Sequence, residues 1–161
     1  MQKKEQSFTF YVYDSIEDLN KEDAALLFEA IKETAHAYAP YSHFRVGAVA
    51  KLSDGKIVAG SNQENASFPV GICAERVLLS AVSSSHSSAY INSLAISYSD
   101  ENSQSNHPIS PCGICRQTLL EYEQRMQHPI KLILSGKSGK IFIIPNASSL
   151  LPLAFTGEEL I

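Results

Sequence analysis

The spacing of apolar residues along the chain switches between a helical period and a strand period, and these switches predict the elements. Apolar positions between 21 and 39 recur every three or four residues, as in an amphipathic helix, and Pro40 ends the pattern. Further helices are expected near 72–82 and 113–122, with a short one near 146–151. Runs of β-branched and aromatic residues predict strands at 8–13, 46–52, 56–61, 91–98, 130–134 and 140–144.

The order of these elements indicates the class of fold. Strands joined through a helix pair in parallel, whereas 46–52 and 56–61 flank a Ser-Asp-Gly turn that is typical of an antiparallel hairpin. The sequence therefore predicts an α/β fold with helices over both faces of a mixed sheet. The serine-rich segment 83–88 and the polar segment 99–110 are expected to be solvent-exposed loops. No repeat or long linker divides the chain, so a single core is expected.

Composition and charge narrow the function classes. Hydrophobic residues make up 44% and charged residues 19% of 161, which is ordinary for a globular protein and excludes a disordered or collagen-like chain. Asp and Glu outnumber Lys and Arg by 17 to 13, and basic residues form no block, so neither a nucleic acid nor a membrane is an expected partner. The apolar run at 8–13 is too short for a secretory signal, and no run could span a bilayer.

The cysteines require an explanation other than a disulfide framework. The chain has three of them, an odd number, and it is long enough to bury a core without covalent cross-links. A reduced, cytoplasmic protein is therefore expected. In such a protein the thiols are free for metal binding or redox chemistry.

All three cysteines lie in two short motifs, Cys-Ala-Glu-Arg at 73–76 and Pro-Cys-Gly-Ile-Cys at 111–115, each at a predicted helix start. The free backbone N–H groups and the dipole at a helix amino end favour a thiolate over a thiol. Cys112 and Cys115 are three residues apart and share one helix face, so they can chelate one ion. With Cys73 they supply three thiolates. Three protein ligands leave the fourth tetrahedral position of zinc open to water, which is typical of a catalytic site.

Charged residues beside the cysteines fit the same interpretation. Glu75 would stand next to a water at the open position and could carry its proton to a substrate nitrogen. Arg76 or Arg116 could offset the negative charge of three thiolates, and Arg76 is the first choice. The combination C-x-E with P-C-x-x-C is the zinc deaminase pattern with Cys in place of the first His.

Two simpler interpretations compete with the metal site. A single C-x-x-C is often a redox pair, and a single buried Cys is usually a small core residue. Either motif alone would favour these interpretations. A redox pair would leave Cys73 and Glu75 unexplained, so the two motifs together favour a metal site.

The chain resembles the small zinc-dependent cytidine deaminases of pyrimidine salvage from about residue 41 to 160. The matching stretches are YSHFRVGA at 41–48, GSNQENASF at 60–68, GICAER at 71–76, SPCGICRQ at 110–117 and LLPLAF at 150–155. The resemblance implies a three-layer α/β/α fold around a mixed five-stranded sheet. The strand at 8–13 would then be an extra one, within an N-terminal extension, 1–20, that precedes a deaminase domain at 21–161.

The resemblance also implies the roles of individual residues. Cys73, Cys112 and Cys115 would hold Zn²⁺, and Glu75 would be the proton shuttle in the hydrolysis of cytidine and deoxycytidine to uridine and deoxyuridine with release of ammonia. The implied substrate contacts are Phe44, Asn62, Glu64, Ala66, Phe68, Ala74 and Phe155. Asn62 and Glu64 would bind the ribose, while Phe44 and Phe155 would pack against the base. A homotetramer is implied, in which Phe155 and the 66–68 segment reach a neighbouring subunit's site.

Some features depart from the family or leave alternatives open. Phe68 stands where the family commonly has tyrosine, so the hydroxyl group that could make a polar contact there is absent. The histidines, at 36, 43, 86, 107 and 128, are expected to be structural or surface residues. One alternative is a deaminase of another aminated heterocycle or of a nucleoside antibiotic, which the Asn62 and Glu64 pair disfavours. Another is a non-catalytic, zinc-stabilised nucleoside-binding protein, which Glu75 disfavours.

Overall fold

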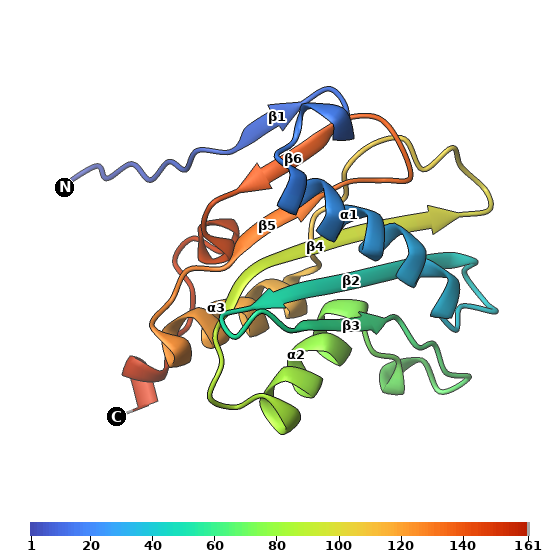
Figure 1. Ribbon diagram of the computed structural model, residues 1–161. Helices are drawn as coiled ribbons and strands as arrows, with labels where there is room; N and C mark the ends of the chain where they lie inside the picture. The colour runs from blue at the N-terminus through green and yellow to red at the C-terminus, as the bar shows by residue number, and fades with distance from the viewer. Residues whose placement is uncertain (161) are drawn as a thin grey trace.

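A computed structural model describes residues 1–160 as one six-stranded sheet between two helical layers (Figure 1). The strands are β1 Tyr11–Tyr13, β2 Phe44–Leu52, β3 Ile57–Ser61, β4 Ile91–Asp100, β5 Lys131–Leu134 and β6 Ile141–Ile144. Their spatial order is β1-β6-β5-β4-β2-β3. Only the β4 and β5 pair is parallel; the other pairs are antiparallel. The expected α/β fold with a mixed sheet is confirmed, and the extra N-terminal strand makes the sheet six-stranded rather than five-stranded.

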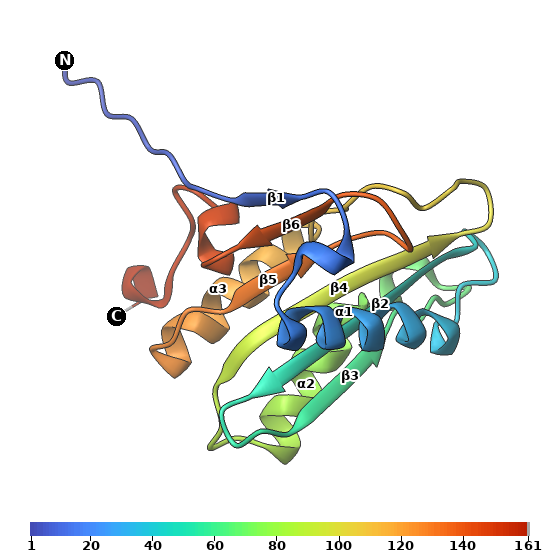
Figure 2. The same ribbon diagram turned by 45° about the horizontal axis from the view of Figure 1, so that its top comes forward.

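Helix α1, Lys21–Glu33, covers one face of the sheet (Figure 2). Asn20 caps its amino end: the Asn20 side chain accepts a hydrogen bond from the backbone N–H of Asp23 at 2.9 Å and so satisfies one of the free amide groups of the first turn. The buried residues of this layer come from the helix and from alternate positions of the strands beneath it: Leu26, Leu27, Ala30, Val49, Ala95, Ile133 and Ile143. Because successive side chains of a strand point to opposite faces of the sheet, the strands contribute to one buried core beneath α1 and to a second on the other face.

Helices α2, Ala74–Ser85, and α3, Gly113–Met126, cover the opposite face. Their buried residues pack against the strand positions that face away from α1, in a cluster that includes Ala48, Leu78, Leu79, Leu94, Ile96, Leu119 and Leu132. This layer is the larger of the two cores. It holds α2 and α3 on the same sheet with their amino ends fixed, which positions the motifs at those ends.

Two glycines allow the helices to lie close to the sheet. A Cβ atom at Gly60 on β3 would lie 2.6 Å from the backbone nitrogen of Leu78 and 2.8 Å from the carbonyl oxygen of Ala74, both in α2. On the other face, a Cβ atom at Gly47 on β2 would collide with the backbone of Ala30 in α1. Only glycine fits at such backbone contacts.

The element boundaries differ from the expected ones at several places. The first strand begins at Tyr11 rather than at residue 8, although the Phe10 ring still packs on Phe142 at a centroid distance of 5.1 Å. Helix α1 ends at Glu33 and continues as a 3-10 turn over Thr34–His36. Helix α2 runs through Ser85, so the start of the expected serine-rich loop is helical. Within residues 1–160, no helix is both long and apolar enough to cross a membrane.

Candidate metal centre and substrate site

The structure brings the three cysteine sulfur atoms together at the amino ends of α2 and α3. Cys73 and Cys112 are the cap residues directly before these helices, and Cys115 lies in the first turn of α3. The Sγ atoms of Cys73 and Cys112 are 3.8 Å apart, and those of Cys112 and Cys115 are 3.5 Å apart. All three sulfurs lie within 4.8 Å of one another. Neither cap side chain accepts a hydrogen bond from a backbone N–H of the helix it precedes, so the helix backbone does not compete with an ion for either sulfur.

This donor set fits zinc. Zinc–sulfur bonds of about 2.3 Å at tetrahedral angles place neighbouring sulfurs about 3.8 Å apart, close to the two separations observed. None of the three cysteines forms a disulfide. The sulfurs come from separate helix starts, so the rest of the fold already holds them near their liganding positions. The residues present are therefore those that a tetrahedral zinc with one open position requires.

The pKa values of Cys73 and Cys115 are shifted in opposite directions. A hydrogen bond from the Cys115 thiol lowers the pKa of Cys73 to about 6, and the positive charge of Arg76 acts in the same direction. The same hydrogen bond, together with burial, raises the pKa of Cys115 well above its usual range. Metal ligands are deprotonated sulfurs, so zinc binding would release the protons that the cluster still holds.

Glu75 is a buried carboxyl group beside this cluster. It lies in the first turn of α2, two residues after Cys73, and only 5% of it is exposed. Burial raises the pKa of its carboxyl group, and the negative charge of Cys73 adds to the effect. A carboxyl group that holds its proton more strongly than usual is suited to accept and return a proton during a reaction.

The two arginines that follow the cysteines have different surroundings. The charge of Arg76 reaches Cys73 and stabilises its thiolate form. Arg116 instead donates to two backbone carbonyl oxygens, that of Pro111 at 2.8 Å and that of Leu150 at 3.0 Å. Arg116 thus ties the segment before Cys112 to the C-terminal region, whereas Arg76 acts on the charge of the cluster.

Asn62, Glu64 and Phe44 form a second group that the structure brings together. The Asn62 side chain accepts from the Val46 N–H at 2.7 Å and donates to the Phe44 carbonyl oxygen at 2.9 Å. The Glu64 carboxylate accepts from the Tyr41 N–H at 2.9 Å and from the Ser42 hydroxyl at 2.5 Å. The two side chains therefore fix the chain that leads into β2.

Gln63 connects this group to the metal cluster. Its backbone N–H donates to the Ile72 backbone carbonyl oxygen, and its backbone carbonyl oxygen accepts from the Ile72 N–H, both at 3.0 Å. Ile72 directly precedes Cys73 in the chain. Asn62 and Glu64, which flank Gln63, are thereby held next to the segment that carries Cys73 and Glu75.

The remaining expected contacts lie partly outside this group. Ala74 is fully buried at the start of α2. Ala66 is exposed, and Phe68, in the 3-10 turn Phe68–Val70, is 90% exposed. Phe155 is also exposed, and its carbonyl oxygen accepts a hydrogen bond from the Gln117 side chain on α3 at 2.9 Å. The Phe68 and Phe155 rings thus point to solvent in a single subunit.

Sequence reasoning did not find two side chains that shape this region. The Ser42 hydroxyl donates to Glu64 and accepts from the Phe44 N–H at 3.0 Å, but in the sequence Ser42 is only one residue of the stretch at 41–48. Tyr98 ends the predicted strand at 91–98, where no pattern marks it for a role, yet its ring stacks on Phe44. The alternation that places Tyr98 on the same face as Ile96 and Leu94 is the one signal that could have indicated its burial.

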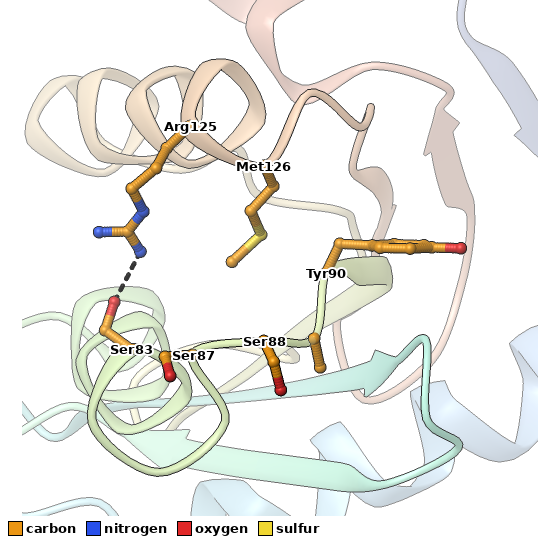
Figure 3. A pocket seen from close by; sticks show the side chains of 7 residues that line it. Ser83, Ser87, Ser88, Tyr90, Arg125 and Met126 are labelled. Carbon is orange, nitrogen blue, oxygen red and sulfur yellow. Dashed lines mark hydrogen bonds between the residues drawn. The ribbon is translucent and has the colours of Figure 1, made fainter.

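A cavity of about 360 Å³ lies away from the cysteines, at the carboxyl ends of α2 and α3 (Figure 3). It is lined by Ser83, Ser87, Ser88, Ala89, Tyr90, Arg125 and Met126. At one side of it Arg125 reaches from α3 towards α2 and donates to the Ser83 hydroxyl at 2.7 Å. None of the residues expected to bind substrate or metal lines this cavity.

Comparisons with known proteins place the cysteine cluster in a family. Residues 20–127 match the family described as cytidine and deoxycytidylate deaminase zinc-binding region. A cytidine deaminase from Halalkalibacterium halodurans is 37% identical over 84% of this chain and 95% of its own. One from Mycobacterium tuberculosis is 39% identical over 63% of this chain and 74% of its own.

A solved structure agrees with these relatives. The crystal structure of cytidine deaminase from Burkholderia pseudomallei superposes with a TM-score of 0.69 at 34% identity, covering 85% of this chain and all of the other. The sequence and the fold of this chain are therefore both similar to those of cytidine deaminases along most of its length.

Proposed function

The chain belongs to the zinc-binding cytidine and deoxycytidylate deaminase family, and from this premise we propose that it hydrolyses cytidine and deoxycytidine to uridine and deoxyuridine. Water replaces the exocyclic amino group, which leaves as ammonia. The observation that carries the proposal is the convergence of three thiols, all within 4.8 Å, beside the buried carboxyl group of Glu75.

Cys73, Cys112 and Cys115 would hold the zinc ion through their sulfur atoms. When bound, zinc supplies Lewis-acid activation of water near neutral pH. Arg76 offsets part of the negative charge of the thiolates, as its effect on Cys73 indicates. The two helix amino ends contribute positive partial charge to the same place.

Glu75 would move the protons. As a carboxylate it accepts a proton from the attacking water and delivers it to N3 of the pyrimidine ring, where negative charge would otherwise develop. It would then take the proton of the hydroxyl group added at C4 and deliver it to the amine, so that the C–N bond breaks, ammonia leaves and the C4 oxygen becomes the carbonyl oxygen of uridine. Burial supports this role, since a raised pKa brings the carboxyl group closer to the acidity needed for proton transfer in both directions.

Asn62 and Glu64 would bind the sugar hydroxyl groups. Existing hydrogen bonds leave Asn62 one amide hydrogen and one lone pair, and they leave Glu64 at least one lone-pair position. The existing bonds hold both side chains in place before substrate arrives, which lowers the entropy cost of binding. Replacing either residue with Ala is expected to raise KM for cytidine more than it lowers kcat.

We propose a homotetramer with shared sites. The exposed Phe68 and Phe155 rings, together with Ala66, would contact a neighbouring subunit. Each Phe155 would reach the site of that neighbour and pack against the base bound there, which the neighbour's own Phe44 and Ala74 also contact. Large exposed apolar side chains such as Phe68, Leu153 and Phe155 support this assembly, because water disfavours such surface. Sedimentation of active protein tests it, and an active monomer would contradict it.

The cellular setting and domain organisation follow the family. We propose a role in pyrimidine salvage in the cytoplasm, where the three thiols would stay reduced. Residues 1–20 would be an extension preceding a deaminase domain at 21–161. Neither nucleic acid nor membrane is an expected partner, given the excess of acidic over basic residues.

A substrate panel on protein of measured zinc content tests the proposed activity. Cytidine and deoxycytidine should release ammonia and a nucleoside antibiotic should not, and a chelator should abolish turnover. Turnover of the antibiotic alone would favour a deaminase of nucleoside antibiotics. Nucleoside binding without ammonia release would favour a non-catalytic, zinc-stabilised nucleoside-binding protein. Both alternatives are less favoured, because the relatives at 37% and 39% identity are cytidine deaminases.

A further inference from the structure

The aromatic ring assigned to the base-binding site rests on a second ring from the sheet. Phe44 and Tyr98 are stacked, with centroids 5.0 Å apart and planes inclined by 19°. In the β2–β4 register, Val46 lies opposite Tyr98 and Phe44 lies opposite Asp100. Phe44 and Tyr98 are therefore diagonal neighbours on one face of the sheet, a relation in which aromatic side chains reach each other.

Tyr98 cannot readily move. Its side chain is among the largest that are fully buried, with 1% exposure. Its hydroxyl group lies 3.1 Å from Nδ1 of His107, and the His107 ring meets the tyrosine edge-on at 5.6 Å between centroids. A buried tyrosine needs such a partner for its hydroxyl group, and His107 provides it.

The segment that carries His107 also contacts the residues on both sides of Phe44. We call residues 100–108 the bracing segment. Within it, the Glu101 carboxylate lies 3.5 Å from Nδ1 of His43 and 3.3 Å from Nη2 of Arg45. His43 has a φ of 59°, a conformation that side-chain-bearing residues rarely adopt, so neighbouring contacts must hold it.

The bracing segment is anchored to the body of the protein. Ser105 is only 2% exposed, its hydroxyl group accepts from the Asp100 N–H at 2.8 Å, and its carbonyl oxygen accepts from the Lys137 N–H at 2.7 Å. Gly136 lies against the Ser105 backbone so closely that a Cβ atom there would collide with it. The contacts behind Phe44 therefore extend to the β5–β6 turn.

We propose that Tyr98 and His107 are positioning residues that hold the Phe44 ring as a fixed stacking surface for the pyrimidine base. The inference rests on the proposed function, which places Phe44 against the base. An isolated phenylalanine at the edge of a site would lose side-chain freedom each time a substrate bound. A ring already stacked on Tyr98 avoids that loss, so the contact strengthens substrate binding rather than proton transfer.

The test compares KM and kcat for cytidine, zinc content and the Kd of uridine across four variants. Tyr98→Leu removes the stacked ring, Tyr98→Phe removes only the hydroxyl group, and His107→Ala removes the partner of that hydroxyl group. Tyr90→Leu is the matched control, because Tyr90 also packs on a histidine, His128, at 4.1 Å between centroids, but lines the cavity at the far ends of the helices.

Tyr98→Leu is expected to raise KM and the Kd of uridine about three- to tenfold, the worth of one aromatic pair, with kcat within about twofold and zinc unchanged. His107→Ala, a change at an exposed residue, is expected to raise both constants about threefold. Tyr98→Phe is expected to raise both constants by about the same factor as His107→Ala, since each change removes the same contact between the hydroxyl group and the imidazole. Tyr90→Leu should change neither constant.

Different failures have different meanings. If the unmodified protein deaminates cytidine but KM and Kd are unchanged in both Tyr98→Leu and His107→Ala, the inference is wrong and the proposed function stands. An equal rise in Tyr90→Leu would also overturn it, because the effect would then be general. If Tyr98→Leu does not fold, His107→Ala decides alone. If the unmodified zinc-loaded protein neither deaminates cytidine nor binds uridine, the proposed function fails and the inference with it.

Discussion

Glu75 and Glu123 are both buried glutamates on the helices of one layer, yet their surroundings differ. The Glu123 carboxylate accepts three backbone N–H groups, from Ile130 at 2.6 Å, Ala147 at 2.8 Å and Ser148 at 3.0 Å. These donors tie the end of α3 to the residue before β5 and to the 3-10 turn Ala147–Leu150, which follows β6. Glu75 lies instead beside thiols, where burial raises its pKa. The first carboxylate is saturated with backbone donors, whereas burial raises the pKa of the second, which suits it to accept and return a proton.

Replacing Glu75 with Gln should separate proton transfer from folding and metal binding. Glutamine has the same shape but cannot carry the proton, so kcat is expected to fall by about two to four orders of magnitude. Zinc content and melting temperature should stay close to those of the unmodified protein, because the three thiols remain. Ammonia release and metal analysis on the same preparation check this, and near-normal turnover would refute the assigned role.

Replacing Glu123 with Gln should reduce stability rather than chemistry. An amide NH₂ group would face one of the backbone N–H groups, so we expect the free energy of unfolding to fall by about 1–3 kcal/mol. Urea denaturation measures this change. Glu121→Gln, an exposed position on the same helix, is the control and should be nearly neutral. Equal stability of the two variants would show that the three bonds contribute little.

At the scale of residues, the sequence predicts the site best where the ligands of one ion must lie at fixed positions along the chain. The predicted convergence of Cys73, Cys112 and Cys115 is confirmed in the structure, since helix starts fix where such residues project. Glu123 and Tyr98 were not predicted to matter, because their partners come from segments that the fold alone brings near. A buried acid on a helix or a tyrosine in a strand carries no mark of those partners in the chain.

At the scale of elements, the close contact between α2 and β3 determines where Cys73 lies. Gly60 permits that contact, and α2 begins directly after Cys73. Hydrophobic periodicity predicted most helices and strands because burial of one face imposes a period. It placed residues 83–85 in a loop, since serines are polar, whereas there they extend α2 and Ser84 bonds back to the Ala81 carbonyl oxygen at 3.2 Å.

Replacing Gly60 with Ala should push α2 away from the sheet. The added methyl group would meet backbone atoms that cannot rotate aside, so a loss of about 1–3 kcal/mol in the free energy of unfolding is expected. Because Cys73 moves with α2, zinc affinity should fall as well, as competition with a chromogenic chelator would show. Gly157→Ala, where a Cβ atom meets nothing within 4 Å, is the control. Unchanged zinc affinity in a destabilised variant would mean that α2 adapts without moving Cys73.

At the scale of the whole molecule, the N-terminal segment closes one edge of the sheet. Tyr11, Val12 and Tyr13 pair with β6, and Phe10 packs on Phe142. The added strand was predicted from its aromatic and β-branched residues, but its register could not be, since pairing partners far along the chain leave no local signal. The metal cluster lies at the amino ends of α2 and α3, on elements that do not include β1.

Deleting residues 1–13 should therefore affect stability and leave catalysis largely intact. Loss of the β1 pairing and of the Phe10 contact is expected to lower the melting temperature by a few degrees, which corresponds to a loss of about 1 kcal/mol in the free energy of unfolding. The ratio kcat/KM for cytidine should stay within about twofold. Deleting only residues 1–7 is the control and should be close to neutral. A large loss of kcat/KM in the longer deletion would assign the extension a part in the active assembly.

The spacing of the sulfur donors has a consequence for how the protein matures. Cys112 and Cys115 share one helical turn, so a nascent chain can capture an ion with them as soon as that turn forms. Cys73 lies 39 residues before Cys112, and β4 runs between them, so the third donor arrives only when the central strands have paired. Ion capture would then proceed in two stages, first by Cys112 and Cys115 and then by Cys73. The state with all three sulfurs bound would form only after the central strands of the sheet have paired.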